Sequence, residues 1–135
     1  MLFRSELIAL GQALSHILPT TFTISPFAPK LHTPLAAAPF TDPDTTLHRI
    51  RQVQRGLGGR VEVRFDSPKW AWLEYRLSQG GLATVQAVLD AHRDGGGWAA
   101  WKAAFARLDQ AHPAEVRAAL AAAERHALWP VVGAR

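Results

Sequence analysis

Four polar side chains that could contact a substrate or a cofactor lie within nine positions of one another: Ser25, Lys30, His32 and Thr33. Three prolines stand among or beside them, at Pro26, Pro29 and Pro34. Each proline fixes its own φ and biases the preceding residue toward extended geometry, which predicts a stiff, non-helical loop after a strand. Loops at strand ends in α/β folds commonly bind ligands. We therefore predict a substrate- or cofactor-facing loop; the alternative is a connector with its polar groups in water and Ser25 capping the turn.

Other catalytic or metal-binding patterns are absent from the sequence. There is no cysteine, which excludes disulfides, redox thiols and thiolate zinc sites. The histidines outside the loop show no His-x3-His spacing and no nearby carboxylate to complete a metal set: His16, His48, His92, His112 and His126. The glycines at 56–59 lack the spacing of a phosphate loop or a dinucleotide fingerprint. We assign no catalytic residue and no metal site, and we expect His92 to be partly buried.

The loop sequence Ser-Pro-Phe-x-Pro-Lys-x-His-Thr-Pro, residues 25–34, resembles a segment of a known family. That segment ends the catalytic barrel in radical S-adenosylmethionine proteins, in the branch that often carries an N-terminal cobalamin-binding domain. Residues 67–81 are similar to the region that follows the barrel, and residues 97–105 also fit. The resemblance spans about residues 5–108, with matching order and spacing.

This resemblance implies that the chain is the C-terminal portion of such an enzyme, without its catalytic centre. The family binds a [4Fe–4S] cluster through a Cys-x3-Cys-x2-Cys motif, and this chain has no cysteine. The cluster, S-adenosylmethionine and, in the cobalamin branch, cobalamin are thus implied for the complete relative, and no cofactor is implied for this chain alone. Lys30 and His32 would contact a polar or anionic group of the cofactor or substrate. Leu31 and residues 79–82 depart from the family pattern, so substrate specificity does not transfer.

The composition predicts one folded domain over residues 1–135. Apolar residues make up 48% of the chain and charged residues 19%, which is typical of a globular protein. No apolar stretch is long enough to span a membrane, and the start of the chain lacks the features of a signal peptide. We expect a cytoplasmic protein.

The net charge of +4 raises the question of nucleic-acid binding. Five arginines cluster within sixteen residues: Arg49, Arg51, Arg55, Arg60 and Arg64. They could follow a phosphate backbone, or they could solvate the outer face of one helix and one strand; we favour the second interpretation. Exposed tryptophans could stack on bases, but helical spacing places Trp70, Trp98 and Trp101 among apolar residues. We therefore expect these three in the core and Trp72 at the surface or in an interface.

The first half of the chain predicts a βαβ unit. An amphipathic helix is expected over residues 5–18, followed by a strand at Thr21–Ser25 and the loop at 26–40. Thr41-Asp42-Pro43 then predicts a helix start, and the glycines at 56–59 its end. Strict alternation over residues 60–65 predicts a half-buried strand. A strand, a helix and a strand in this order indicate a parallel or mixed pairing.

Beyond residue 66 every pattern is helical. Helices are predicted at about 67–77, 82–92, 98–108 and 113–128. The second of these carries an apolar stripe of Leu82, Val85, Val88, Leu89 and His92. The predicted fold class is α/β: a βαβ portion at residues 1–66 that resembles the end of a partial TIM-type barrel, followed by a helical tail at 67–135.

Two functions remain open from the sequence. The first is the C-terminal segment of a radical S-adenosylmethionine enzyme, which supplies the closing barrel strand, its loop and a helical cover and is inactive by itself. Its partner would be the missing N-terminal part of the enzyme, or a second copy paired through the strand edge at Thr21–Ser25. The second is a stand-alone accessory or binding domain, with nucleic acid as a candidate ligand that we do not favour.

Overall fold

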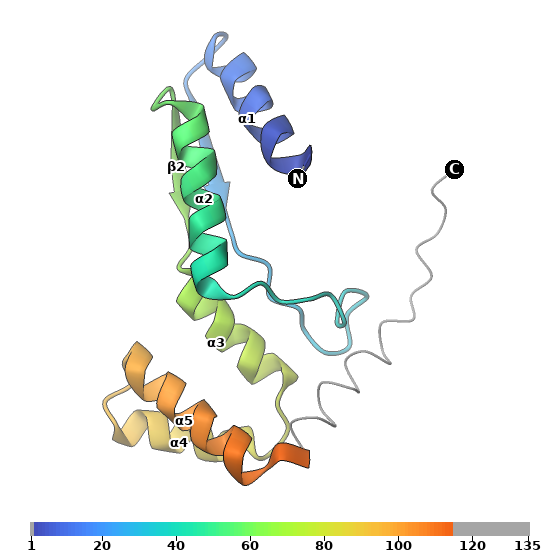
Figure 1. The fold of residues 1–135 in the computed structure, drawn as a ribbon, viewed down its shortest axis with the longest axis vertical. Coiled ribbons are helices and arrows are strands. Elements are labelled where there is room, and N and C mark those ends of the chain that lie inside the picture. Colours follow the sequence, from blue (N-terminus) through green and yellow to red (C-terminus); the bar gives the residue numbers. More distant parts are fainter. Residues whose placement is uncertain (1, 115–135) are drawn as a thin grey trace. The chain divides into compact units, whose positions relative to one another are not determined.

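The computed structural model describes residues 2–114 and shows a mixed α/β protein (Figure 1). Its elements in chain order are α1 (Leu2–Ser15), β1 (Thr20–Ile24), α2 (Pro43–Leu57), β2 (Val61–Phe65), α3 (Pro68–Gln79), α4 (Thr84–Arg93) and α5 (Trp98–Ala111). The helix predicted at 113–128 lies almost wholly outside the described residues. None of the described helices combines the length and apolarity needed to cross a membrane.

The chain divides into two compact units. The sheet unit contains the residues up to Phe27 together with Thr41–Ala71, and the helical unit contains Ala28–Phe40 and the chain from Trp72 onward. The loop that follows β1 therefore belongs to the helical unit, and the division falls within α3.

The sheet unit is built on the predicted parallel pair of strands. β1 and β2 pair in parallel, with Thr20 opposite Val61 and Ile24 opposite Phe65. α2 connects them, and its ends follow the predicted signals. Asp42 caps its first turn, and Gly58, with φ of 61°, ends it in the left-handed conformation that glycine adopts without steric cost. The βαβ prediction is confirmed.

Both helices of this unit cover the same face of the sheet. Buried side chains of α2 and β2, Val53, Leu57 and Val61, form the centre of the core. The partly buried residues around them come from α1 and from both strands: Leu7, Ile8, Phe22, Ile24 and Val63. The opposite face consists of exposed polar side chains, namely Thr21, Thr23, Glu62 and Arg64. Within the sheet unit, the strands thus have one apolar, covered face and one polar, uncovered face.

A glycine allows α1 to lie this close to the core. A methyl group on Gly11 would lie 2.6 Å from Leu57 Cδ2 and 2.9 Å from Phe22 Cε2. These distances are shorter than van der Waals contacts, so any larger residue at this position would require the side chains of Leu57 and Phe22, or the helix itself, to shift. The Nε2 of Gln12, on the next position of α1, donates a hydrogen bond to the carbonyl oxygen of Gly56 at 2.9 Å.

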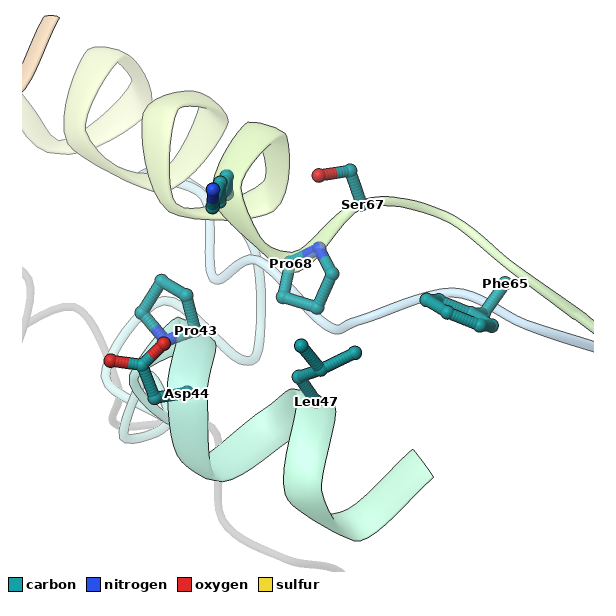
Figure 2. Close-up of a pocket in the computed structure, with 7 residues that line it drawn as sticks. Pro43, Asp44, Leu47, Phe65, Ser67 and Pro68 are labelled. Atoms are coloured by element: carbon teal, nitrogen blue, oxygen red, sulfur yellow. The ribbon is translucent and has the colours of Figure 1, made fainter. Parts of the chain in front are cut away.

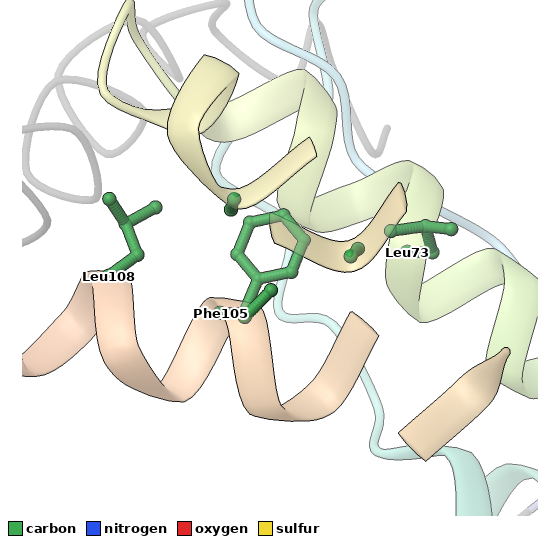
Figure 3. Packing of buried hydrophobic residues seen from close by; sticks show 6 residues of the cluster. Leu73, Phe105 and Leu108 are labelled. Carbon is green, nitrogen blue, oxygen red and sulfur yellow. The ribbon is translucent and has the colours of Figure 1, made fainter. Parts of the chain in front are cut away.

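The helical unit is centred on Phe105 of α5, which is 1% exposed (Figure 3). It contacts the alanine faces of the α4–α5 hairpin and Leu73 of α3. Trp72 packs edge-on against Phe105, with ring centroids 5.5 Å apart. The guanidinium of Arg76 lies 4.6 Å from the Phe105 ring centroid and forms an ion pair with Asp109. The cation–π contact and the ion pair both join α3 to α5.

Three expectations about buried faces are wrong. Trp70 is exposed, whereas Trp72 is partly buried against the core of the helical unit. Helical spacing puts Trp70 on one face with Leu73 and Leu77, but Trp70 and Leu77 are exposed, and the buried side of α3 includes Leu73 and, in part, Trp72. His92 is exposed rather than partly buried.

The apolar stripe of α4 is exposed with His92, because α4 turns its alanines and not its larger side chains toward α5. Helical periodicity identifies an apolar stripe, but it does not say which of two stripes faces the neighbouring helix.

The N-cap of α2 predicts a pH-dependent contribution to stability. The backbone N–H of Thr45 donates to Asp42 Oδ1 at 2.9 Å, and this hydrogen bond holds the pKa of Asp42 below its ordinary value. A depressed folded-state pKa gives stability that is present above the unfolded pKa, about 3.9, and is lost as the pH falls through the folded pKa. We expect Asp42→Ala to lower the Tm at neutral pH.

Asp42→Asn is the matched control, because its amide oxygen can cap the helix but does not titrate. Its Tm at neutral pH should stay close to that of the parent, and its decline below about pH 4 should be shallower. Circular-dichroism melts across the acid range measure both effects. Parallel acid declines for Asp42→Asn and the parent would contradict the assignment.

Candidate functional site at the sheet edge and in the proline-rich loop

The predicted site residues fall in two different units. Ser25 belongs to the sheet unit, whereas Lys30, His32 and Thr33 belong to the helical unit. The structure therefore defines two separate polar features, which are described one at a time.

In the sheet unit, Ser25 lies at the carboxyl edge of the parallel pair. It directly follows β1, and Asp66 directly follows β2. The Ser25 hydroxyl donates a hydrogen bond to Asp66 Oδ2 at 2.6 Å, and the Asp66 N–H donates to the carbonyl oxygen of Ile24 at 3.1 Å. Both side chains are exposed. This edge is where open and closed parallel α/β sheets bind ligands.

The sequence prediction missed Asp66. A signal was available, because Ser25 ends the first predicted strand and Asp66 directly follows the second. Parallel strands end at the same edge, so these two side chains were bound to be neighbours.

A pocket of about 310 Å³ opens beside the same edge (Figure 2). Apolar groups from three elements form most of its wall, and polar groups form the rest; the lining residues are Pro43, Asp44, Leu47, Phe65, Ser67, Pro68 and Lys69. The helix α2 begins at Pro43 and the helix α3 begins at Pro68, so the first turns of both helices border the pocket. The N-terminal end of a helix carries a partial positive charge. The pocket can hold a small group that is mostly apolar and carries a polar substituent.

In the helical unit, the contacts of Lys30 and Thr33 define where these two predicted loop residues lie. Lys30 Nζ lies 2.6 Å from Glu74 Oε1 of α3, with both side chains about half exposed. An exposed pair of this kind contributes little to stability, but it fixes where the ammonium group lies. The Thr33 hydroxyl donates to the carbonyl oxygen of Lys30 at 2.7 Å. His32 between them has a φ of 62°, a left-handed conformation that is uncommon outside glycine.

Both ends of the loop are attached to α3. At one end, Gln79 Nε2 and the Ser78 hydroxyl each donate to the carbonyl oxygen of Pro29, at 2.9 and 3.1 Å. At the other end, Phe40 stacks on Tyr75 with ring centroids 4.6 Å apart and planes 5° from parallel. These contacts hold the segment that presents His32 and Thr33 in a defined position.

The arginine cluster does not form a continuous set of unpaired cations. Arg64 Nε donates to Glu62 Oε1 at 2.8 Å. This bond, with a second one from Thr21, lowers the pKa of Glu62, and it raises the pKa of Arg64. Arg55 Nε donates to the carbonyl oxygen of Arg51. Among residues 2–114, no group of three or more potential ligands is arranged to hold a metal ion.

Comparison with known proteins finds no match to this chain. No protein-family description matches the chain, and neither the curated proteins nor the solved structures contain a match.

The attachment of the loop to α3 predicts a local effect of substitution. Gln79 is 5% exposed and supplies the buried hydrogen bond to Pro29. We expect Gln79→Ala to reduce the free energy of unfolding by about 1–2 kcal/mol, as for a lost buried hydrogen bond, and to speed amide exchange in residues 30–39. Leu77→Ala, at an exposed position on the same helix, is the control. Unchanged exchange in the loop of Gln79→Ala, measured by mass spectrometry, would contradict the role of this contact.

Proposed function

We propose that this chain is the C-terminal segment of a radical S-adenosylmethionine enzyme, as the resemblance at residues 25–34 and 67–81 implies. It supplies the closing strand of a partial TIM-type barrel, the proline-rich loop that follows this strand and a helical cover. It has no catalytic activity by itself, because it has no thiolate to ligate a [4Fe–4S] cluster. The cluster and S-adenosylmethionine, and cobalamin in the related branch, belong to the complete enzyme.

One observation carries the barrel part of this proposal: α1 and α2 cover the same face of a two-stranded parallel sheet. Successive helices on one side of successive parallel strands are typical of a barrel, where the helices form the outer layer. In a doubly wound sheet, the helices are divided between both faces. The shared core of α1, β1, α2 and β2 therefore supports the barrel arrangement.

The uncovered face supports the same proposal. Parallel sheets are normally buried on both faces, and two strands are too few for an independent sheet. Here the second face carries Thr21, Thr23, Glu62 and Arg64, which are exposed in this chain. In a barrel this face would line the interior, where the other strands would cover its polar side chains.

The functional residues have distinct roles in this proposal. Ser25 and Asp66 lie at the carboxyl end of the strands, where TIM-type barrels carry their active sites. Lys30, His32 and Thr33 form the substrate- or cofactor-facing part of the loop. The partner is the N-terminal part of the enzyme, which would extend the sheet at the edge of β1. If that part is missing, a second copy is expected to pair with this edge instead.

The proposal predicts that activity requires a second polypeptide segment. The purified chain should bind no stoichiometric iron–sulfur cluster after anaerobic reconstitution and should form no 5′-deoxyadenosine from S-adenosylmethionine. The DNA directly upstream should encode a frame with Cys-x3-Cys-x2-Cys. The product of that frame, combined with this chain, should bind the cluster and cleave S-adenosylmethionine. A cluster on the chain alone, or an upstream region without such a frame, would overturn the proposal.

A second candidate function is a stand-alone domain that binds nucleic acid, suggested by the arginines of α2 and β2. The ion pair of Arg64 with Glu62 offsets one positive charge of the cluster and argues against a dedicated phosphate-binding surface. We expect RNA binding, measured by fluorescence anisotropy, to be weak and to disappear near physiological salt. Tight binding that persists in salt, and that Arg49→Ala with Arg55→Ala abolishes, would favour the second function.

A further inference from the structure

The strand β2 has one edge that no other strand covers in the part of the chain that the structure describes, because its only paired neighbour there is β1. On the β1 side, the N–H of Asp66 donates to the carbonyl oxygen of Ile24. Successive backbone groups of a strand point to opposite sides. The N–H and C=O groups of Val61, Val63 and Phe65 therefore point away from β1. We call this side the outer edge of β2.

The outer edge has the properties of a surface that receives another strand. A row of N–H and C=O groups without strand partners is a template for strand pairing. A sheet with an apolar face also needs three or more strands for independent stability. The apolar face of β2 is incompletely covered, since Phe65 is 39% exposed and Val63 is only partly buried. One added strand would supply the missing backbone partners and extend this apolar face.

The charges along β2 are complementary to those of the same strand in the reverse direction. Glu62 and Arg64 stand one position to either side of Val63, and Arg60 and Asp66 stand three positions to either side. In an antiparallel pair of two copies centred on Val63, Glu62 would stand opposite Arg64 of the second copy. Arg60 would stand opposite Asp66 of the second copy. All four charged side chains are exposed, and each would meet the opposite charge.

The backbone of β2 fits the same register. Opposed residues in an antiparallel pair alternate between hydrogen-bonded and non-hydrogen-bonded positions. With Val63 at the centre, the hydrogen-bonded positions are those of Val61, Val63 and Phe65, whose backbone groups point to the outer edge. Glu62 and Arg64 then occupy non-hydrogen-bonded positions, where opposed side chains lie closer together.

Other registers of the same pair are unfavourable. A shift by two residues places either Glu62 opposite Glu62 of the second copy or Arg64 opposite Arg64 of the second copy, and like charges that stand directly opposite each other are destabilising. A shift by one residue turns the apolar side chains of one copy to the polar face. The strand β1, with the sequence TTFTI, has no charge that could select a register in this way.

We propose that β2 pairs in the antiparallel direction with β2 of a second copy of this chain, centred on Val63, and so forms a four-stranded sheet. Within one chain Arg64 is paired with Glu62 at 2.8 Å, and both side chains are exposed. An exposed pair contributes little to stability, so it can be exchanged for the cross-strand pairs. The pairing uses the edge opposite to that of β1 and does not depend on the proposed enzymatic relationship.

Two charge reversals in the full-length chain test this pairing. Glu62→Arg and Arg64→Glu each turn two attractive cross-strand pairs into repulsive ones, so each should raise the dissociation constant of the dimer by about tenfold or more. An equimolar mixture of the two variants should restore dimerisation, because unlike charges again stand opposite each other in the mixed pair. Sedimentation equilibrium over a concentration series measures the dissociation constants.

Arg51→Glu is the matched control, because it lies at an exposed position of α2 and changes the net charge as much as Arg64→Glu does. It should leave the dissociation constant nearly unchanged, and circular-dichroism melts verify that all variants fold. A parent chain that stays monomeric throughout the series would overturn the proposal. The same holds for a dimer that neither reversal weakens, as expected for pairing through β1, and for a mixture that does not restore dimerisation.

A second measurement needs no variant. In the parent chain, amide exchange at Val61, Val63 and Phe65, followed by NMR, should slow as the protein concentration rises through the range in which the dimer forms, because pairing protects these N–H groups. Exchange at Glu62 and Arg64, whose N–H groups point toward β1, should depend less on concentration. Rates at the first three residues that do not change with concentration would contradict the pairing.

Discussion

The close approach of α1 to the parallel strand pair is the contact on which the sheet unit depends. A two-stranded parallel sheet has too little hydrogen bonding and too little buried area to persist alone. Its stability comes from the apolar face that α1 and α2 cover together, and Gly11 permits α1 to reach Leu57 and Phe22. The strand register, and with it the meeting of Ser25 with Asp66, follows from that packing.

Local signals were sufficient to predict the βαβ portion. Asp42 and Pro43 mark a helix start by hydrogen-bonding capacity and fixed φ, and Gly58 marks its end by the conformation it allows. The alternation at residues 61–65 predicts a half-buried strand because successive side chains point to opposite faces. The orientations of α3 and α4 could not be predicted in this way. The choice between the alanine face and the larger stripe of α4 depends on how closely α5 can approach, which is a property of the pair.

The contacts around the candidate site could not be predicted from the sequence for a similar reason. Prolines predict a stiff loop, and the structure adds attachments that the sequence does not reveal: Gln79 and Ser78 to Pro29, and Tyr75 to Phe40. These pairs are separated by many residues, so no local pattern contains them. The left-handed backbone of His32 is likewise not contained in a local pattern, since histidine is enriched in that conformation but seldom adopts it.

The assignment of residues 28–40 to the helical unit has a consequence for how this chain could be rearranged. The backbone passes between the two units at three points: after Phe27, after Phe40 and after Ala71. A unit that is joined to its neighbour by one linker can be exchanged as a cassette by a single recombination event, but these two units cannot. A gene fusion that kept only the chain from Trp72 onward would lose the segment that attaches to Ser78 and Gln79, so the two units are expected to be inherited together.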